Sequence, residues 1–556
     1  MAKANGGGLF AKSLKKEGVE QIFTLCGGHI MPILYGCREE GIEVVDCRHE
    51  AAAAYAADAY ARVSGKPGIV VTTAGVGVTN TTTAIVEARE SGVPIIAIGG
   101  ASPLTENQTG PLQHLNSLEI MSAASKWASK IYHANRIPEY VSMAYRHALS
   151  GTPGPVYLEC ASDTLREPVE EEEVCYPEYH RTGDQPFGDP HSVEKAADLL
   201  AKAAKPAMII GHGARFSAQY GEAIGELADY LKMPAYAQTI ADGLFAGGDN
   251  PLFKVGIGAL SAADVVLMLC VNNDYTVKKG KAPFIKDGAK LIQVHTDSAR
   301  IGYNAPAHIG IIGGAGAVAR QILEALRAKT DKKEDMSWFN EAAMAMFTFG
   351  QPFMEGFMSE AAPMHPGRCA AEVAKFLEAE GKDWTVVCDG GDSGQWMMMA
   401  ATAHRPGQKL SYGPLGTLGV GCGYTLGAWK ANKKPVLYYT GDGSFGFYTM
   451  EFDTFVRQGI PVVCVISNDS GWGMVRYDCK TYHSGQLEKV GFVGTELESL
   501  RRYEKLPAMW DGYGELVTDP NEIVPAIKRA YESGKPAIIN VETDRVSNNP
   551  VNWLFL

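Results

Sequence analysis

The sequence lacks the features that mark several broad protein classes. It has no uninterrupted apolar run of about 18 residues, so no membrane span is expected. Its first residues contain no apolar segment of the kind found in secretion signals. The 11 cysteines form no CxxC pair and no zinc spacing, which favours reduced core thiols in a cytoplasmic protein. A formal net charge of -12 argues against a general nucleic-acid binder, which would carry a basic stripe.

What the sequence does have is a recurring Lys-Pro pair followed by a short apolar run. The pairs begin at Lys66, Lys205, Lys434 and Lys535. Short continuous apolar runs are typical of strands buried on both faces, and hence of parallel sheets. Helical patterns, such as residues 50–63 and 192–204, lie between them. This alternation predicts doubly wound α/β domains, which bind ligands at the carboxyl ends of their strands.

Two stretches divide the chain into three blocks. Residues 166–190 are rich in acid, Pro and Gly, and residues 329–366 carry few strand signals. At 556 residues the chain is too long for one domain. We therefore expect three parallel-sheet domains, at residues 1–168, 190–330 and 365–545.

A magnesium motif is the strongest local signal. Gly441-Asp-Gly443 follows an apolar strand pattern, and Asn468 follows the next strand pattern after 24 intervening residues. Mg²⁺ prefers hard oxygen ligands and keeps only a few protein ligands beside phosphates and water. Asp442 and Asn468 would supply side-chain oxygens and Ser470 a backbone carbonyl. The plainer alternative is a strand–turn–helix in which Asp442 caps the helix.

This motif resembles the thiamine diphosphate (ThDP) site of the acetolactate synthase–pyruvate decarboxylase superfamily, and the three blocks match that family in order and size. The resemblance implies that residues 1–168 bind the pyrimidine of ThDP and residues 365–545 its diphosphate with Mg²⁺. The central block can hold FAD or ADP in this family. The residues implied to bind the cofactor are Gly416, Leu418, Gly441, Asp442, Gly443, Ser444 and Asn468.

The resemblance also assigns individual roles. Glu50 matches the carboxylate that bonds the aminopyrimidine ring of the cofactor. The alternative is an acidic residue that the helix dipole favours in a first turn. Leu418 matches the apolar wedge that bends ThDP, and the Gly416 carbonyl would accept a bond from its amino group.

Substrate-side residues lie in glycine turns that follow strand patterns. His29 lies in one such turn and Gln113 in another, and both should face the same strand ends. Histidine can move a proton near neutral pH, although a turn histidine can also simply bond to backbone. The segments around His29, Glu50 and Asp442 are similar to 2-hydroxyacyl-CoA lyases and benzaldehyde lyase. True acetolactate synthases usually lack a histidine at the position of His29.

The central block has a weaker nucleotide pattern. Gly213 and Arg215 lie in a glycine turn, and Asp297 stands at a strand end where an acid suits an adenosine ribose. Lys278 belongs to a lysine cluster that could meet phosphates or face solvent. These loops look like the ADP- or CoA-contacting loops of the CoA lyase branch.

We interpret the chain as a ThDP- and Mg²⁺-dependent carbon–carbon lyase or ligase, most similar to 2-hydroxyacyl-CoA lyase. The alternatives are an acetolactate synthase-like or benzaldehyde lyase-like carboligase acting without CoA, and a non-catalytic ThDP-fold protein. The family implies a homodimer at minimum and a homotetramer as the full assembly, acting on small molecules. The apolar end of the chain, residues 546–556, is expected to be either a lid over the substrate channel or a structural dock.

Overall fold

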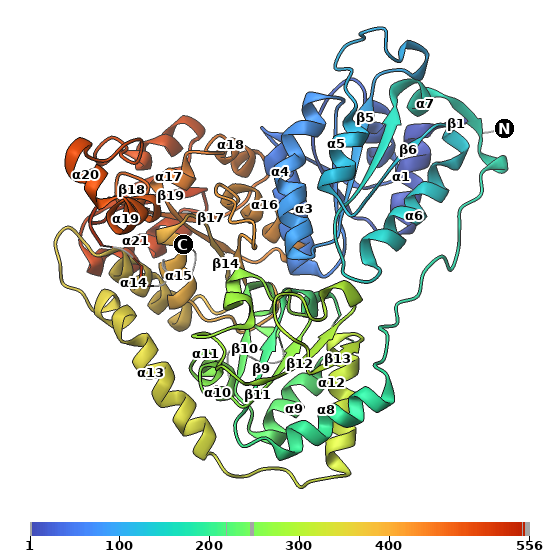
Figure 1. The fold of residues 1–556 in the computed structure, drawn as a ribbon. Helices are drawn as coiled ribbons and strands as arrows, with labels where there is room; N and C mark the ends of the chain where they lie inside the picture. Colours follow the sequence, from blue (N-terminus) through green and yellow to red (C-terminus); the bar gives the residue numbers. More distant parts are fainter. Residues whose placement is uncertain (1–2, 218, 245–249, 548, 551–556) are drawn as a thin grey trace. The chain divides into compact units, whose positions relative to one another are not determined.

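The computed structural model describes residues 3–217, 219–244, 250–547 and 549–550 of the chain (Figure 1). The chain folds into two compact units. Unit 1 contains Met1–Gly183, Leu415–Lys433 and Tyr448–Ile460. Unit 2 contains Asp184–Pro414, Lys434–Phe447 and Pro461–Leu556.

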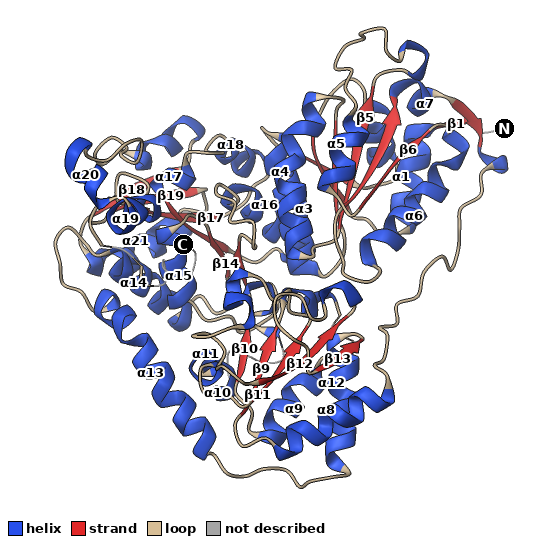
Figure 2. Cartoon of the chain, viewed as in Figure 1, coloured by secondary structure: helices blue, strands red, loops and turns tan. Residues whose placement is uncertain are grey.

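Unit 1 is built on a six-stranded parallel sheet, of which β5 and β6 are labelled in Figure 2. The strand order is β3-β2-β4-β5-β7-β6. Its central strands are apolar and buried along their whole length, as strands covered by helices on both faces must be. The strands are β2 (Gln21–Leu25), β3 (Glu43–Asp46), β4 (Gly68–Thr72), β5 (Ile95–Ala101), β6 (Trp127–Ile131) and β7 (Val156–Ala161). The main helices are α1 (Gly6–Lys16), α2 (Met31–Glu39), α3 (Glu50–Ser64), α4 (Val76–Ser91), α5 (Ser117–Ala124) and α6 (Ile137–Leu149).

Helix α3 is buried around its whole circumference, unlike an amphipathic surface helix. Every residue from Glu50 to Arg62 is buried. Helices α16 (Gly421–Asn432) and α18 (Glu451–Arg457), from a distant part of the sequence, belong to the same unit, and α16 lies beside α3 (Figure 1). A Cβ on Gly427 would lie 2.0 Å from the carbonyl oxygen of Ala56. The alanines of α3 and the glycines of α16 therefore permit a close helix–helix contact.

Unit 2 holds two further parallel sheets. The central sheet has the order β10-β9-β11-β12-β13, and the third sheet has the order β15-β14-β16-β17-β19-β18. The central strands are β9 (Pro206–Ile210), β10 (Ala235–Ala237), β11 (Val265–Leu269), β12 (Lys290–His295) and β13 (Ile309–Ile312). The third sheet contains β14 (Thr385–Cys388), β15 (Lys409–Ser411), β16 (Val436–Gly441), β17 (Val462–Asn468), β18 (Tyr513–Val517) and β19 (Ala537–Glu542).

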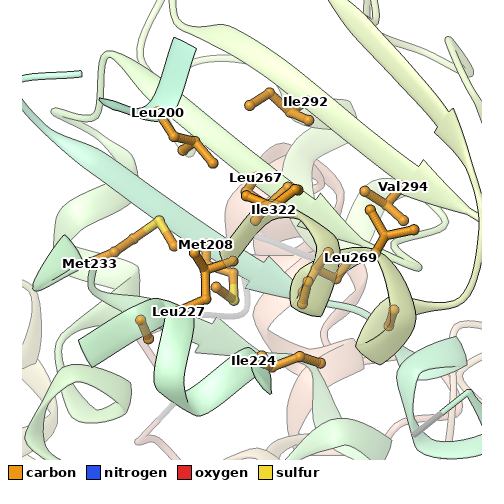
Figure 3. Close-up of a cluster of buried hydrophobic side chains, with 14 of the residues drawn as sticks. Leu200, Met208, Ile224, Leu227, Met233, Leu267, Leu269, Ile292, Val294 and Ile322 are labelled. Carbon is orange, nitrogen blue, oxygen red and sulfur yellow. The ribbon is translucent and has the colours of Figure 1, made fainter. Parts of the chain in front are cut away.

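The core of the central sheet lies between its strands and three helices. Leu267 and Leu269 of β11 and Ile292 of β12 pack with side chains such as Leu227 of α9 and Ile322 of α12, all fully buried (Figure 3). The helices are α8 (Pro190–Lys202), α9 (Glu222–Leu231) and α12 (Ala315–Arg327). Around the third sheet lie α14 (Pro366–Ala379), α15 (Asp392–Ala400), α17 (Asp442–Phe445), α19 (Gly473–Tyr482), α20 (Ser484–Val490) and α21 (Ile523–Glu532).

The predicted fold class, three doubly wound parallel-sheet domains, is confirmed. One segment differs from expectation: the break at residues 329–366 contains a 21-residue helix, α13 (Ser337–Phe357), which contributes buried side chains of Trp338 and Phe353 to neighbouring cores. This segment shows few strand patterns because its apolar residues recur at the spacing of a helix rather than that of a strand. Among the described residues, no helix is long and apolar enough to cross a membrane.

The expected lid, residues 546–556, falls partly outside the described residues, which do not include 548 and 551–556. Within the described part, the backbone N–H of Asn549 donates a 2.7 Å hydrogen bond to Asp392 at the start of α15. This contact attaches Asn549 to α15 beside the third sheet, and the lid and the structural dock stay predictions.

Candidate functional site

Three turns of unit 2 meet at the carboxyl edge of the third sheet. They follow β14, β16 and β17, which are neighbours in the sheet. Asp442 is the first residue of α17, directly after β16, and Asn468 is the last residue of β17. A Cβ on Gly443 would lie 2.9 Å from the ring of Trp472, so only glycine fits there. The parallel topology therefore brings Asp442, Gly443 and Asn468 to one edge of the sheet.

A buried carboxyl group, that of Asp442, and a partly buried one, that of Asp469, lie at this edge. Asp442 is 2% exposed, and its Oδ1 has no hydrogen-bond partner among the described residues. Burial raises the pKa of the Asp442 carboxyl group and that of the neighbouring Asp469. The neighbouring charge of Asp442 raises the pKa of Asp469 further, while Arg476 opposes this rise. A buried carboxylate oxygen that lacks a partner among the described residues, beside a second carboxylate, is a donor set that fits a hard divalent cation.

Asn468 is held firmly by its amide group. Its Nδ2 donates to Asn540 Oδ1 at 3.1 Å and to the Arg501 carbonyl at 3.2 Å. Its Oδ1 accepts from the Ser470 backbone N–H at 3.2 Å. The amide is therefore oriented with its oxygen toward the turn, the side from which it could ligate a cation.

Ser470 has a different arrangement. Its φ angle is +56°, and its carbonyl accepts from Arg476 at 2.8 Å and from Arg545 at 3.0 Å. Two guanidinium groups thus occupy the carbonyl that sequence analysis assigned to Mg²⁺. Ser444, the remaining residue of the turn, is buried, and Ser393 at the start of α15 approaches the turn at Gly441.

Glu50 lies in unit 1, where it begins α3 and is 6% exposed. Its Oε2 accepts a 2.9 Å hydrogen bond from Asn80 of α4. A Cβ on Gly77 would lie 3.5 Å from Glu50 Oε1 and 2.8 Å from Thr73 Cγ2. Gly77 therefore lets the Glu50 carboxylate and Thr73 approach the same point.

His29, Thr73 and Gln113 form a cluster. His29 Nδ1 is 3.2 Å from Thr73 Oγ1, and the Thr73 hydroxyl donates to Gln113 Oε1 at 3.4 Å. In the tautomer with the proton on Nδ1, His29 donates to Thr73 Oγ1 and its Nε2 is a proton acceptor. Burial lowers the pKa of His29, and the charge of Arg166 lowers it further.

The sequence thus identified two of the three members of this cluster. The third, Thr73, directly follows β4 and was not among the predicted site residues. Its signal was available, since β2 and β4 are adjacent and their following turns must meet.

The loop at residues 415–419 also belongs to unit 1. Gly416 has a φ of +72°, and Leu418 is half-buried. Between them, the Thr417 hydroxyl donates a 2.7 Å hydrogen bond to Glu87 Oε2 of α4. The loop that sequence analysis assigned to the bend of the cofactor is therefore anchored to a buried acid.

The four proposed nucleotide residues follow neighbouring strands of the central sheet. Gly213 and Arg215 lie in η4 (His212–Phe216) after β9, Lys278 in η7 (Tyr275–Gly280) after β11, and Asp297 after β12. Burial lowers the pKa of Arg215, and Asp297 accepts from the Ala299 N–H at 2.9 Å. A separate cavity of about 690 Å³ in unit 2 is lined by other residues, including Gln238, Phe349 and Met399.

The chain matches three family descriptions along its length. Residues 4–120 match "Thiamine pyrophosphate enzyme, N-terminal TPP binding domain", residues 193–322 the central domain and residues 370–541 the C-terminal TPP binding domain. It is 31% identical to a probable acetolactate synthase of Mycobacterium bovis, covering 97% of this chain and 96% of that protein. It is 30% identical to 2-hydroxyacyl-CoA lyase 2 of Bos taurus, covering 97% and 90%. It is 27% identical to oxalyl-CoA decarboxylase of Escherichia coli, covering 96% and 94%.

Proposed function

Because this chain belongs to the acetolactate synthase-like family of thiamine diphosphate enzymes, we propose that it is a ThDP- and Mg²⁺-dependent lyase and ligase of 2-hydroxyacyl-CoA thioesters. In the lyase direction the products are an aldehyde or ketone and formyl-CoA. In the other direction the same two compounds are joined by a new carbon–carbon bond.

The residues of both units suit this cofactor. ThDP, when bound, supplies the electron sink for breaking a bond next to a carbonyl. Glu50 would bond the aminopyrimidine ring, Leu418 would support the bent cofactor and the Gly416 carbonyl would accept from its amino group. Asp442 and Asn468 would ligate Mg²⁺, with Gly441, Gly443 and Ser444 facing the diphosphate. The Ser470 carbonyl would complete this set by exchanging one guanidinium donor for the ion.

The observation that carries the substrate assignment is the cluster of His29, Thr73 and Gln113 close to Glu50. Cleavage of a 2-hydroxyacyl compound requires a base for its hydroxyl group. In the tautomer with the His29 proton on Nδ1, facing Thr73 Oγ1 at 3.2 Å, Nε2 can take the hydroxyl proton. The amide of Gln113 can orient a substrate oxygen by donating from Nε2.

Purified protein supplied with ThDP and Mg²⁺ tests the proposal. We expect it to cleave a 2-hydroxyacyl-CoA to formyl-CoA and an aldehyde, and to lose this activity in the His29→Ala variant. A 2-hydroxyketone without CoA and pyruvate are assayed beside the thioester. Formation of acetolactate, or cleavage of the plain hydroxyketone alone, would favour the second candidate.

That second candidate is an acetolactate synthase-like or benzaldehyde lyase-like carboligase acting without CoA. It is supported by relatives named acetolactate synthase at 31% identity over nearly the whole chain. A third candidate, a non-catalytic protein with the ThDP fold, predicts cofactor binding without turnover of any of these substrates.

We further propose that the active form is a homodimer assembled into a homotetramer, because in this family the pyrimidine domain of one chain meets the diphosphate domain of another. The central domain is proposed to bind ADP, CoA or FAD through Gly213, Arg215, Lys278 and Asp297. Denaturing the purified protein and identifying the released ligand by its absorbance spectrum and mass tests this assignment.

A further inference from the structure

Glu451, the first residue of α18, contacts the turn that leads into α3. Its Oε1 accepts hydrogen bonds from two consecutive backbone N–H groups, those of Arg48 and His49, each at 2.9 Å. The next residue along the chain is Glu50. The side chain of Glu451 is 2% exposed, so these bonds are shielded from water.

Both oxygens of the Glu451 carboxylate accept hydrogen bonds. Oε2 accepts from the Thr454 hydroxyl at 2.6 Å, which fixes the rotation of the carboxylate plane. Burial raises the pKa of Glu451, while Thr454 and the two backbone N–H groups oppose that rise. Hydrogen bonds from backbone N–H groups to a buried carboxylate are short and stronger than those between neutral groups. Two of them on one oxygen set the planes of two successive peptides.

The last residue of α18 and the residue after it bind the end of β3, where the turn begins. Gln458 Nε2 donates to Asp46 Oδ1 at 3.2 Å, and Arg457 pairs with the same carboxylate. At the other end, His49 caps α3 by accepting from the Ala51 N–H at 3.1 Å, and its ring lies 5.2 Å from that of Tyr448. The turn between β3 and α3 is therefore attached to the segment around α18 at both ends.

We propose that Glu451 is a positioning residue for Glu50. It holds the peptides of residues 48 and 49 so that the Glu50 carboxylate, bonded to Asn80 at 2.9 Å, stays where it meets the cofactor ring. The inference rests on the proposed role of Glu50 in activating ThDP. Misplacement of a reacting group by about 1 Å can slow a reaction by about 100-fold, so a contact that touches no substrate can control the rate.

The test compares Glu451→Ala, Glu451→Gln and a control, Asp453→Ala, in the ThDP- and Mg²⁺-loaded enzyme. Asp453 lies on the same helix, where its carboxylate accepts from the side chains of Arg48 and Arg457. The readouts are the affinity for ThDP, the exchange of the cofactor's C2 proton for deuterium by quenched NMR, and the melting temperature. Glu50→Gln serves as the reference for lost activation.

We expect Glu451→Ala to slow C2 exchange by about 10- to 100-fold while ThDP affinity stays within about threefold. Glu451→Gln keeps a carbonyl oxygen for the two N–H groups, so it should retain more exchange than Glu451→Ala. Asp453→Ala should exchange at the rate of the unaltered enzyme.

Unchanged C2 exchange in a folded Glu451→Ala variant, beside a Glu50→Gln reference that has lost exchange, would overturn the inference and leave the proposed function intact. If Glu451→Ala does not fold, Glu451→Gln decides, since slowed exchange at an unchanged melting temperature supports the inference and normal exchange rejects it. Normal exchange in Glu50→Gln itself would instead overturn the proposed role of Glu50, and with it this inference.

Discussion

A buried charge network beneath α3 makes a stability prediction that can be worked out from its geometry. Asp58 of α3 accepts from Arg62 Nε at 2.6 Å and Nη2 at 2.9 Å, and from the Tyr424 hydroxyl of α16 at 2.8 Å. The guanidinium also lies 3.8 Å from Glu87 and 4.9 Å from the centre of the Tyr424 ring. Asp58, Arg62 and Glu87 are at most 1% exposed.

Replacing Asp58 by alanine would leave the Arg62 guanidinium buried beside Glu87, at the longer distance of 3.8 Å. Breaking a buried ion pair by removing one partner typically costs about 3–5 kcal/mol, because the other charge remains desolvated. The Tyr424 hydroxyl loses its acceptor in the same change, which favours the upper part of that range. We therefore expect Asp58→Ala to lower the opening free energy of α3 by about 4–5 kcal/mol.

Hydrogen exchange measured by mass spectrometry on peptides covering residues 50–64 reports this quantity for α3 alone, which matters in a chain of several domains. The exposed pair Arg320–Glu324, also four residues apart on a helix, provides the control. Glu324→Ala should change local stability by about 0.5 kcal/mol or less. A loss below about 1 kcal/mol in Asp58→Ala would refute the reasoning. The double variant Asp58→Leu with Arg62→Met should recover much of the loss, since no charge is then left buried.

Three further predictions concern the proposed site. Because burial lowers the pKa of His29, the imidazole is neutral at every pH above that lowered value. The value of kcat/KM should therefore fall on the acid side, below pH 6.5, and the pH profile of His29→Ala should lack this fall. Thr417→Val should weaken ThDP binding by roughly tenfold, because it removes a hydrogen bond to a buried carboxylate. Thr417→Ser should bind ThDP normally in a fluorescence titration, and equal affinities of the two variants would contradict the anchoring role. Glu50→Gln and Asp442→Ala should each be inactive alone and regain partial activity when mixed and allowed to exchange subunits, and no recovery after proven exchange would argue against a shared site.

Much of the fold follows from local patterns. The apolar run that follows the Lys-Pro pair at Lys434 is β16 (Val436–Gly441), and the helix expected at residues 50–63 is α3 (Glu50–Ser64). These elements were predictable because continuous apolar runs and helical spacing are properties of neighbouring residues. The positions of His29, Asp442 and Asn468 at strand ends follow in turn, since parallel strands present their carboxyl ends at one edge.

The sequence alone therefore determined the three sheets, the edges at which polar turns meet, and the residue types available there. Only the tertiary structure decided which side chains touch: Asp469 beside Asp442, Thr73 between His29 and Gln113, and Glu451 against a backbone 403 residues away. Such contacts depend on how segments that are far apart in the sequence pack together. A periodic pattern within one segment does not reveal which other segment it will contact. The alanines of α3 are an example. In the sequence they indicate a helix, and only the structure shows that they allow α16 to pack closely against it.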